Sequence, residues 1–283
     1  MKNVYFTVDL EEWYELDYLK DYELTGEKVK VVPQIINFLD VLDKYGVKAT
    51  FFVVANIAEQ NREIIKEIKK RGHSVGCHGL NHKLLYDKSN EDFYDEIVKA
   101  KNIIENITRD RICGYRSACF SLERDKLELL IKAGYKYDSS KILFKQHPLY
   151  RNLDLSGFDA VDDLVYQNED FFEYEIPTLS IGKYSIPISG GGYLRLFPFW
   201  LIKLLINKYE KKHKNFTVYL HPFELTNAPL PLPADLSAVT RFRCLVGRKG
   251  NLKKIEKIIK MFRAQNAEFK TLDTDRRERL GNC

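Results

Sequence analysis

Two closely spaced histidines give the first indication of chemistry in this sequence. Residues 72–82 read GHSVGCHGLNH and contain three of the six histidines of the chain. His78 and His82 are four residues apart, a spacing that lets both imidazole rings reach one ion. A carboxylate from a neighbouring strand would complete a three-ligand metal site with open positions for water. The same pair could also serve only in hydrogen bonds, so the spacing alone leaves both interpretations open.

A group of carboxylates follows the first apolar run of the chain, residues 4–10. Side chains alternate between the two faces of a strand, so Asp9 and Glu11 would project in one direction and Glu12 in the other. Two carboxylates on one inward face repel each other unless a cation or a base neutralises them. The alternative is an acidic strand end exposed to water. Together with the histidine pair, these carboxylates favour a metal site.

Three further polar residues lie in or at the ends of later predicted strands: Arg116 lies within the strand 114–120, and Asp138 and His221 each end a later strand. Arg116 stands among uncharged neighbours, where a guanidinium needs an anionic partner, and Asp9 is the candidate. In an α/β barrel the strand ends meet at one rim, which is where such folds place catalytic groups. Singly, each residue has a structural explanation, as a buried ion pair or a core histidine. Jointly they predict a hydrolytic metal site.

The elements that must position these residues alternate between strand and helix. The predicted strands are residues 4–10, 49–55, 74–77, 114–120, 174–181, 184–188, 216–220 and 269–272. The predicted helices are residues 32–45, 61–71, 90–107, 124–133, 199–212 and 252–265. Such alternation indicates a parallel sheet with crossover helices, and an α/β barrel is favoured over a doubly wound sheet. We expect a single domain over residues 1–283, with an irregular insertion at about 143–172.

Composition excludes several classes of protein. The chain has 283 residues, 45% of them hydrophobic and 30% charged, which is typical of a globular protein. A net charge of +5 without an evident basic stripe predicts no nucleic-acid partner. Five cysteines without a C-x-x-C pair indicate neither a disulfide framework nor a cysteine zinc site.

The sequence also makes predictions about membranes and location. No apolar run is long enough to span a bilayer, and the N-terminus becomes polar at Asp9, so we expect no signal peptide and a cytoplasmic location. Residues 197–206, followed by several lysines, could dock on a membrane surface. A helix packed on the sheet is the favoured interpretation of that segment.

In the order of its motifs the chain resembles the polysaccharide deacetylases of carbohydrate esterase family 4, which have the NodB-homology fold. The matching motifs are Thr7–Trp13, His78–His82, Arg116–Phe120, Asp138–Ser140 and Leu220–Pro222. The segments Gly190–Pro198, His221–Glu224 and Arg241–Arg243 further resemble a bacterial branch associated with exopolysaccharide and exosortase systems. Two motifs depart from the family pattern: the usual Asp-Asp is Asp9-Leu10-Glu11-Glu12 here, and Arg-x-Pro is Arg116-Ser117-Ala118.

The resemblance implies a distorted (β/α)7–8 barrel and one divalent metal ion, Zn²⁺ in the first place and Co²⁺ or Ni²⁺ as alternatives. It implies metal ligation by Glu11, His78 and His82, with Glu12 as the second choice for the carboxylate. The catalytic residues that it implies are Asp9 as base, Arg116 beside it, His221 as acid, and Asp138 orienting Arg116 or His221. The substrate contacts expected are Phe120, whose neighbouring backbone N–H would face the oxyanion, Tyr193 and Arg195.

The activity implied is removal of the N-acetyl group from a sugar in a polysaccharide, an oligosaccharide or a glycan precursor. The alternatives are hydrolysis of cyclic imides, ureides or N-formyl sugars on the same fold, and a saccharide-binding module that has lost catalysis. Retention of Asp9, both motif histidines and His221 argues against the binding module.

Overall fold

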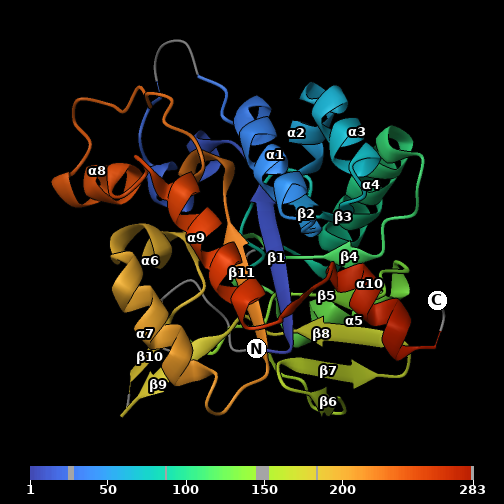
Figure 1. The fold of residues 1–283 in the computed structure, drawn as a ribbon. Coiled ribbons are helices and arrows are strands. Elements are labelled where there is room, and N and C mark those ends of the chain that lie inside the picture. The colour runs from blue at the N-terminus through green and yellow to red at the C-terminus, as the bar shows by residue number, and fades with distance from the viewer. Residues whose placement is uncertain (25–28, 87, 145–152, 183, 282–283) are drawn as a thin grey trace.

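The computed structural model describes residues 1–24, 29–86, 88–144, 153–182 and 184–281. Its central sheet has the strand order β11-β1-β2-β3-β4-β5-β8-β7-β6 (Figure 1). The strands of this sheet are β1 (Asn3–Leu10), β2 (Ala49–Val53), β3 (Ser74–Cys77), β4 (Gly114–Tyr115), β5 (Tyr137–Asp138), β6 (Asp159–Asp162), β7 (Val165–Asn168), β8 (Phe171–Tyr174), β11 (Asn215–Leu220) and β12 (Glu268–Phe269), which pairs with β1. The seven strands from β11 to β8 are parallel, and β7 and β6 continue the sheet antiparallel. A separate hairpin joins β9 (Thr178–Ile181) to β10 (Tyr184–Pro187).

Helices cover the outside of this sheet (Figure 1). The α-helices are α1 (Ile36–Lys44), α2 (Ala55–Gln60), α3 (Arg62–Lys70), α4 (Asn90–Thr108), α5 (Arg124–Lys132), α6 (Gly191–Leu196), α7 (Phe199–Tyr209), α8 (Ala238–Leu245), α9 (Asn251–Ala264) and α10 (Leu272–Arg279). The described residues also form five short 3₁₀ helices, η1 (Trp13–Glu15), η2 (Asp17–Leu19), η3 (Val32–Ile35), η4 (Ala118–Phe120) and η5 (Pro222–Glu224). The predicted barrel-type α/β class is confirmed, but among the described residues β11 and β8 do not pair, so the ring of strands is open.

The alternation of side chains in β1 explains where the site forms. All eight residues of β1 are buried. Val4, Phe6 and Val8 belong to the main hydrophobic core, which includes residues of the surrounding helices, whereas Tyr5 belongs to a second, aromatic cluster with residues of β2, β5 and β8. Because Tyr5 and Asp9 share a face, the inner face is aromatic near the start of the strand and carries its carboxylate at the C-terminal end.

The C-terminal helix α10 closes the aromatic end of the sheet. The hydroxyl groups of Tyr5 and Tyr174 each donate to the carboxylate of Asp275, at 2.9 Å, and Arg279 forms an ion pair with the same carboxylate. Of the predicted strand 269–272, only Phe269 belongs to a strand, at the end of β12. The strand stops there because Thr271 is the N-cap of α10 and accepts a hydrogen bond from the backbone N–H of Thr274.

Other segments differ from the sequence-based expectation for local reasons. The predicted strand 114–120 ends at Tyr115, since Cys119 and Phe120 both adopt left-handed backbone conformations with φ of 50° and 52°. The stretch 143–172, expected to be irregular, contains β6 and β7 among its described residues. The expected strand 174–181 is split between β8 and β9.

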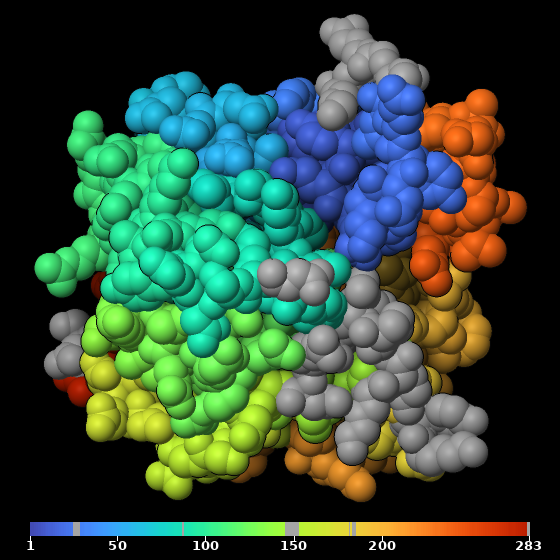
Figure 2. All heavy atoms as spheres, turned by 180° about the vertical axis from the view of Figure 1, so that it is seen from behind, coloured from blue at the N-terminus to red at the C-terminus, as the bar shows by residue number. Residues whose placement is uncertain are grey.

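The segment after β1 packs against a later part of the chain. Trp13, Leu16 and Val31 form one buried cluster with Leu236 and Cys244, which lie near or within α8. In Figure 2 the corresponding blue and orange segments lie side by side on the right of the molecule. Residues far apart in sequence thus enclose the C-terminal end of β1.

Candidate metal centre

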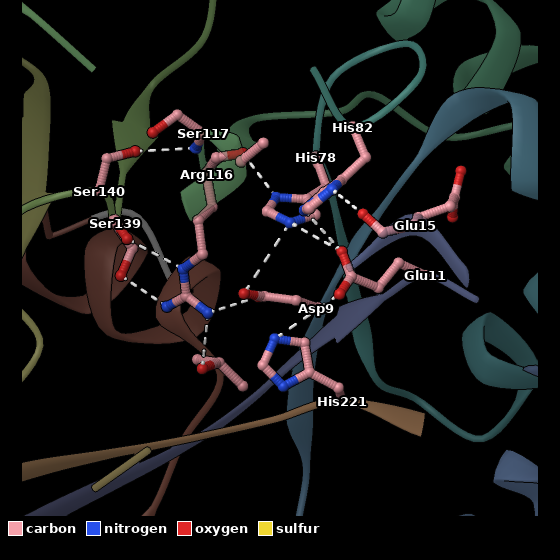
Figure 3. A network of polar contacts seen from close by, with 12 residues as sticks. Asp9, Glu11, Glu15, His78, His82, Arg116, Ser117, Ser139, Ser140 and His221 are labelled. Atoms are coloured by element: carbon pink, nitrogen blue, oxygen red, sulfur yellow. Dashed lines mark hydrogen bonds and ion pairs between the residues drawn. The ribbon is translucent and has the colours of Figure 1, made fainter. Parts of the chain in front are cut away.

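Three predicted ligands converge at the C-terminal ends of β1 and β3. One donor atom each from Glu11, His78 and His82 lies within 4.8 Å of the others. Glu11 Oε2 is 2.7 Å from His82 Nε2 and 3.8 Å from His78 Nε2. Figure 3 shows the carboxylate of Glu11 facing both rings. The backbone of His82 is left-handed, with φ of 46°, and this uncommon conformation places its ring beside that of His78, 5.1 Å away.

Hydrogen bonds fix which nitrogen of each ring faces the carboxylate. Nδ1 of His78 lies 2.8 Å from the carbonyl oxygen of Arg116, and Nδ1 of His82 lies 3.0 Å from that of Glu15. A carbonyl oxygen only accepts, so each Nδ1 carries a proton and donates it. In the neutral ring Nε2 then carries no proton, and its lone pair is directed towards Glu11. Metal-binding histidines show the same arrangement.

The residues present fit a divalent cation. Glu11 is 2% exposed, and its Oε2 faces the Nε2 atoms of both His82 and His78. Burial opposes protonation of His82, but the Glu11 carboxylate outweighs it and raises the pKa of the ring. A positive charge is therefore favoured between the carboxylate and the ring, and a metal ion would supply it without a proton.

The alternative carboxylate, Glu12, points elsewhere. Its Oε2 accepts a hydrogen bond from the backbone N–H of Val31 at 2.8 Å, and its Oε1 accepts from that of Val32 at 3.3 Å. This agrees with the alternation argument, which favoured Glu11. Glu12 therefore holds the segment before α1 against the end of β1.

We expect Glu12→Ala to weaken folding while leaving metal binding intact. The substitution leaves two buried backbone N–H groups without acceptors, which costs about 1–3 kcal/mol of unfolding free energy. Chemical denaturation and metal analysis after loading would measure both effects. Glu23→Ala, at an exposed position, is the control and should change stability by less than about 0.5 kcal/mol. Loss of the ion in Glu12→Ala would instead identify Glu12 as a ligand.

On one side of the three ligands lies a buried ion pair between Asp9 and Arg116. Arg116 Nη1 donates to Asp9 Oδ1 at 2.7 Å and to Thr7 Oγ1 at 2.9 Å. Its Nε and Nη2 donate to the carbonyl and hydroxyl oxygens of Ser139, and its guanidinium lies 4.3 Å from the centre of the Phe52 ring. The predicted ion pair between Arg116 and Asp9 is therefore present, and every nitrogen of the guanidinium donates a hydrogen bond.

The second oxygen of Asp9 stays directed towards the ligands. Asp9 Oδ2 is 3.9 Å from Nε2 of His78. Burial opposes ionisation of Asp9, but the charge of Arg116 outweighs it, with help from nearby imidazoles, and lowers the pKa of the carboxyl group. Asp9 is thus a carboxylate with one oxygen held by Arg116 and one available for a proton.

His221 also borders the ligands, with its Nε2 3.8 Å from Glu11 Oε1 (Figure 3). Its Nδ1 lies 3.2 Å from Oε2 of Glu224, which also accepts the backbone N–H of His221 at 2.9 Å. Burial lowers the pKa of His221 and the Glu224 carboxylate raises it, with a net rise to about 9. His221 is therefore a protonated ring with Nε2 turned into the site.

Arg195, expected to contact substrate, instead supports Glu224 from behind. Arg195 Nε donates to Glu224 Oε1 at 3.0 Å, and its other nitrogens donate to the carbonyl oxygens of Val246 and Arg243. Only 5% of the residue is exposed. The expectation of direct substrate contact therefore differs from the structure, because all three guanidinium nitrogens are occupied inside the protein.

Asp138, Phe120 and Tyr193 also differ in part from their expected roles. Asp138 accepts from the backbone N–H and hydroxyl of Ser140, and the contacts with Arg116 come from Ser139. Phe120 is buried, and its own N–H is bonded to the carbonyl of Ser117, so the expected oxyanion contact with a neighbouring N–H stays a prediction. Tyr193 is half-buried on α6, and its ring lies 5.8 Å from that of Phe197 with the planes tilted by 53°.

Asp138 forms a buried carboxyl pair with Glu173 across β5 and β8. Burial raises the pKa of Glu173 well above its ordinary value of 4.5, and the neighbouring Asp138 raises it further. The side chains of the two residues are hydrogen-bonded to each other, which requires a proton on one of the carboxyl groups. The pair therefore shares one proton at neutral pH.

This shared proton predicts a pH dependence of stability. The folded protein holds the proton of Glu173 more tightly than the unfolded chain, so stability is lost as the pH rises above about 4.5 towards the folded-state pKa. In Glu173→Gln this loss should disappear, and Tm measured from pH 5 to 9 should be less pH-dependent than in the parent. Glu169→Gln, at an exposed position, should leave the parent curve unchanged. Parallel curves for Glu173→Gln and the parent would contradict the shared proton.

Comparison with known proteins places two parts of the chain in described families. Residues 29–137 match the family described as polysaccharide deacetylase, and residues 149–274 match one described as a domain of unknown function, DUF3473. The second match covers the segments that resemble the exopolysaccharide-associated branch.

A peptidoglycan deacetylase of Helicobacter pylori is 31% identical over 106 residues, which are 38% of this chain and 36% of that protein. A peptidoglycan-N-acetylglucosamine deacetylase of Bacillus cereus is 31% identical over 143 residues, 50% of this chain and 63% of that protein. The chain thus spans less than two thirds of the length of either relative.

Experimental structures show the same fold at low sequence identity. A Mycobacterium smegmatis protein with a provisional assignment as a polysaccharide deacetylase superposes with a TM-score of 0.62 at 15% identity, over 98% of this chain and 89% of that one. An allantoinase superposes with a TM-score of 0.60 at 14% identity, over 97% of this chain and 89% of that one. At these identities the likeness extends to the fold alone.

Proposed function

We propose that this chain, a member of the polysaccharide deacetylase family through residues 29–137, is a metal-dependent hydrolase that removes the acetyl group from an N-acetylated sugar. The observation that carries the proposal is that the carboxylate of Asp9 and the ring of His221 both border the group formed by Glu11, His78 and His82. A base and an acid beside a cation site are the groups that amide hydrolysis requires.

The proposed ion is Zn²⁺, since two imidazole nitrogens and one carboxylate oxygen form a common catalytic zinc site. When bound, the ion would polarise the acetyl carbonyl and make a water molecule more acidic. Co²⁺ and Ni²⁺ accept the same donors, so a metal series would establish which ion supports activity.

Asp9 is proposed as the general base. Its lowered pKa keeps it ionised at neutral pH, and its free oxygen faces the ligand site, where it would take the proton of the attacking water. Arg116 holds the other oxygen and so fixes the direction of that proton transfer.

His221 is proposed as the general acid. An amine leaves poorly as an anion, so a proton must reach the sugar nitrogen as the C–N bond breaks. The raised pKa of His221 means that Nε2 carries this proton at neutral pH. Glu224 stabilises the protonated ring, and Arg195 positions Glu224.

Gly191 offers a test of this support. A Cβ atom at Gly191 would lie 1.6 Å from Oε2 of Glu224, so Gly191→Ala must displace the carboxylate. We expect deacetylation to fall at least about tenfold, because a general acid contributes a factor of about 10²–10⁴. Metal content should stay that of the parent. Gly192→Ala is the matched control, since nothing lies within 4 Å of its added Cβ. Equal activity of the two variants would exclude Glu224 as a support of catalysis.

The experiment that tests the function is acetate release from N-acetylglucosamine oligosaccharides by the zinc-loaded protein. Parallel assays with allantoin and with an N-formyl sugar would separate the alternatives that the same fold supports. Acetate release that depends on zinc and is absent in Asp9→Asn supports the proposal. Saccharide binding without turnover of any substrate would favour a binding module instead.

A further inference from the structure

Exposed large hydrophobic side chains are concentrated on one part of the surface. Nine such residues occur in the described chain, and six of them lie on or directly beside α6, α7 and α8. These six are Leu196, Trp200, Leu204, Val239, Phe242 and Leu245. Trp200 is 67% exposed and Phe242 56%, values unusual for aromatic side chains in a folded protein. We call this set the apolar face.

The helices present these residues away from the core. In α7 the buried residues are Ile202, Leu205, Ile206 and Tyr209, whereas Trp200 and Leu204 lie one turn apart on the opposite side. In α8 only Cys244 is buried, and Val239 and Phe242 lie three residues apart on the exposed side. Packing inside this chain therefore does not account for the apolar face.

The two parts of the apolar face adjoin each other. Arg195, next to Leu196 at the end of α6, donates to the carbonyl oxygens of Arg243 and Val246 at the end of α8. The backbone carbonyl of Arg195 would also lie 2.1 Å from a Cβ atom at Gly247, so the two chain segments are in direct contact. Figures 1 and 2, seen from opposite sides, both place α8 above α6 and α7 along one flank of the molecule.

Positive charge surrounds the apolar face. Residues 195–214 and 236–254 contain twelve Lys and Arg against one acidic residue, Glu210, a net charge of +11. Two of the twelve, Arg195 and Arg248, are buried, and Arg195 is paired with Glu224. The whole chain carries +5, so its other 244 residues carry −6. Lys203, Lys208 and Arg243 are exposed on the same helices. A groove of about 450 Å³ between α7 and α9 is lined by Lys203, Lys257 and Lys260 among others.

We propose that the apolar face and its basic surroundings form a docking surface for an anionic lipid membrane. Exposed Trp, Phe and Leu flanked by Lys and Arg are the pattern of interfacial binding, in which apolar side chains enter the headgroup boundary and cations meet anionic headgroups. Pairing with a second copy of this chain would bring two surfaces of high positive charge together. Nucleic acid would match the charge but not the aliphatic side chains at the centre of the surface.

Vesicle binding by the full chain tests the proposal. The protein is mixed with vesicles of phosphatidylcholine alone or with added phosphatidylglycerol, and binding is measured by sedimentation. The chain has two tryptophans, of which Trp13 is 1% exposed and Trp200 is 67% exposed. We therefore expect a blue shift of the fluorescence of Trp200 on vesicles that contain phosphatidylglycerol, together with binding that weakens as salt is added.

Paired variants separate the apolar from the electrostatic contribution. Trp200→Gln with Phe242→Gln removes aromatic contact, and Lys203→Glu with Lys208→Glu reverses charge. Each pair should lower partitioning by at least about tenfold. The matched controls are Ile131→Gln with Val161→Gln, and Lys66→Glu with Lys70→Glu, at exposed positions outside the surface. Both control pairs should partition like the parent, and melting curves confirm that each variant is folded.

Three results would overturn the proposal. The first is absence of binding to vesicles with phosphatidylglycerol. The second is equal loss of binding in the control pairs. The third is a dimer in size-exclusion chromatography, or binding to an RNA oligonucleotide, that Trp200→Gln with Phe242→Gln abolishes while vesicle binding persists.

Discussion

Purified protein that has been loaded with Zn²⁺ and desalted is expected to retain about one ion per chain, and Glu11→Gln, His78→Ala and His82→Ala to retain none. The reason lies in the donor geometry. Each Nδ1 is committed to a backbone carbonyl, so the two Nε2 atoms and the Glu11 carboxylate are the groups left to hold the ion. Removal of one of three protein ligands leaves a pair, which binds zinc too weakly to survive desalting. Deacetylation should fall to background in all three variants.

Glu12→Gln is the matched control for Glu11→Gln, because the two carboxylates are adjacent in sequence and both are buried. The control should keep the ion and the activity, since one amide oxygen still accepts a hydrogen bond from the backbone. Mass spectrometry of the metal under native conditions measures the stoichiometry directly. A parent protein that retains no ion would contradict the metal centre. Retention of the ion by His78→Ala and His82→Ala would show that it binds at another site.

The ligand positions follow from the sequence because they depend on local geometry. Alternation along β1 separates Glu11 from Glu12, and the structure shows the separation. The ends of parallel strands share one edge of a sheet, so Asp9, His78 and His221 were expected together, and they lie together. The strand–helix alternation likewise predicted the sheet from β1 to β4.

The supporting residues could not be predicted in the same way, because their contacts are set by tertiary packing. Arg195 reaches Glu224 across 29 positions, and no periodic pattern indicates that its guanidinium turns inward. Ser139, rather than Asp138, reaches Arg116, since the carboxylate pairs with Glu173 on the neighbouring strand. The close spacing of His221 and Glu224 was a usable signal of their contact. A glutamate three residues after the N-cap of a helical turn can accept a hydrogen bond from the backbone N–H of the N-cap residue, which here is His221.

The shortness of β4 also depends on local backbone conformation. Two left-handed residues in succession, Cys119 and Phe120, end the extended segment after Tyr115, and neither is a glycine whose presence would have indicated the turn. Strain of this kind persists where the surrounding structure holds it, and it occurs here beside Arg116. Of the seven non-glycine residues with positive φ among those described, three lie at or beside the site: His82, Cys119 and Phe120.

Asp9→Asn is expected to lower the rate of deacetylation by a factor of about 10²–10⁴ while the protein keeps its ion. Asparagine has the shape of aspartate, and its amide oxygen can still accept the hydrogen bond from Arg116. The amide cannot take a proton from water, so the loss isolates the role of Asp9 as base. Ser139→Ala is the control, since it removes one hydrogen bond from the same guanidinium and leaves the carboxylate in place.

The two variants should therefore differ in rate by at least about tenfold, with equal metal content and similar thermal stability. Measurement of kcat and KM locates the effect, because a missing base lowers kcat and leaves substrate binding largely unchanged. If Asp9→Asn kept activity within a factor of about ten of the parent, the proton would have another acceptor. Glu11 could not replace it while holding the ion, and His221 carries a proton at neutral pH, so that result would overturn the assignment of base and acid together.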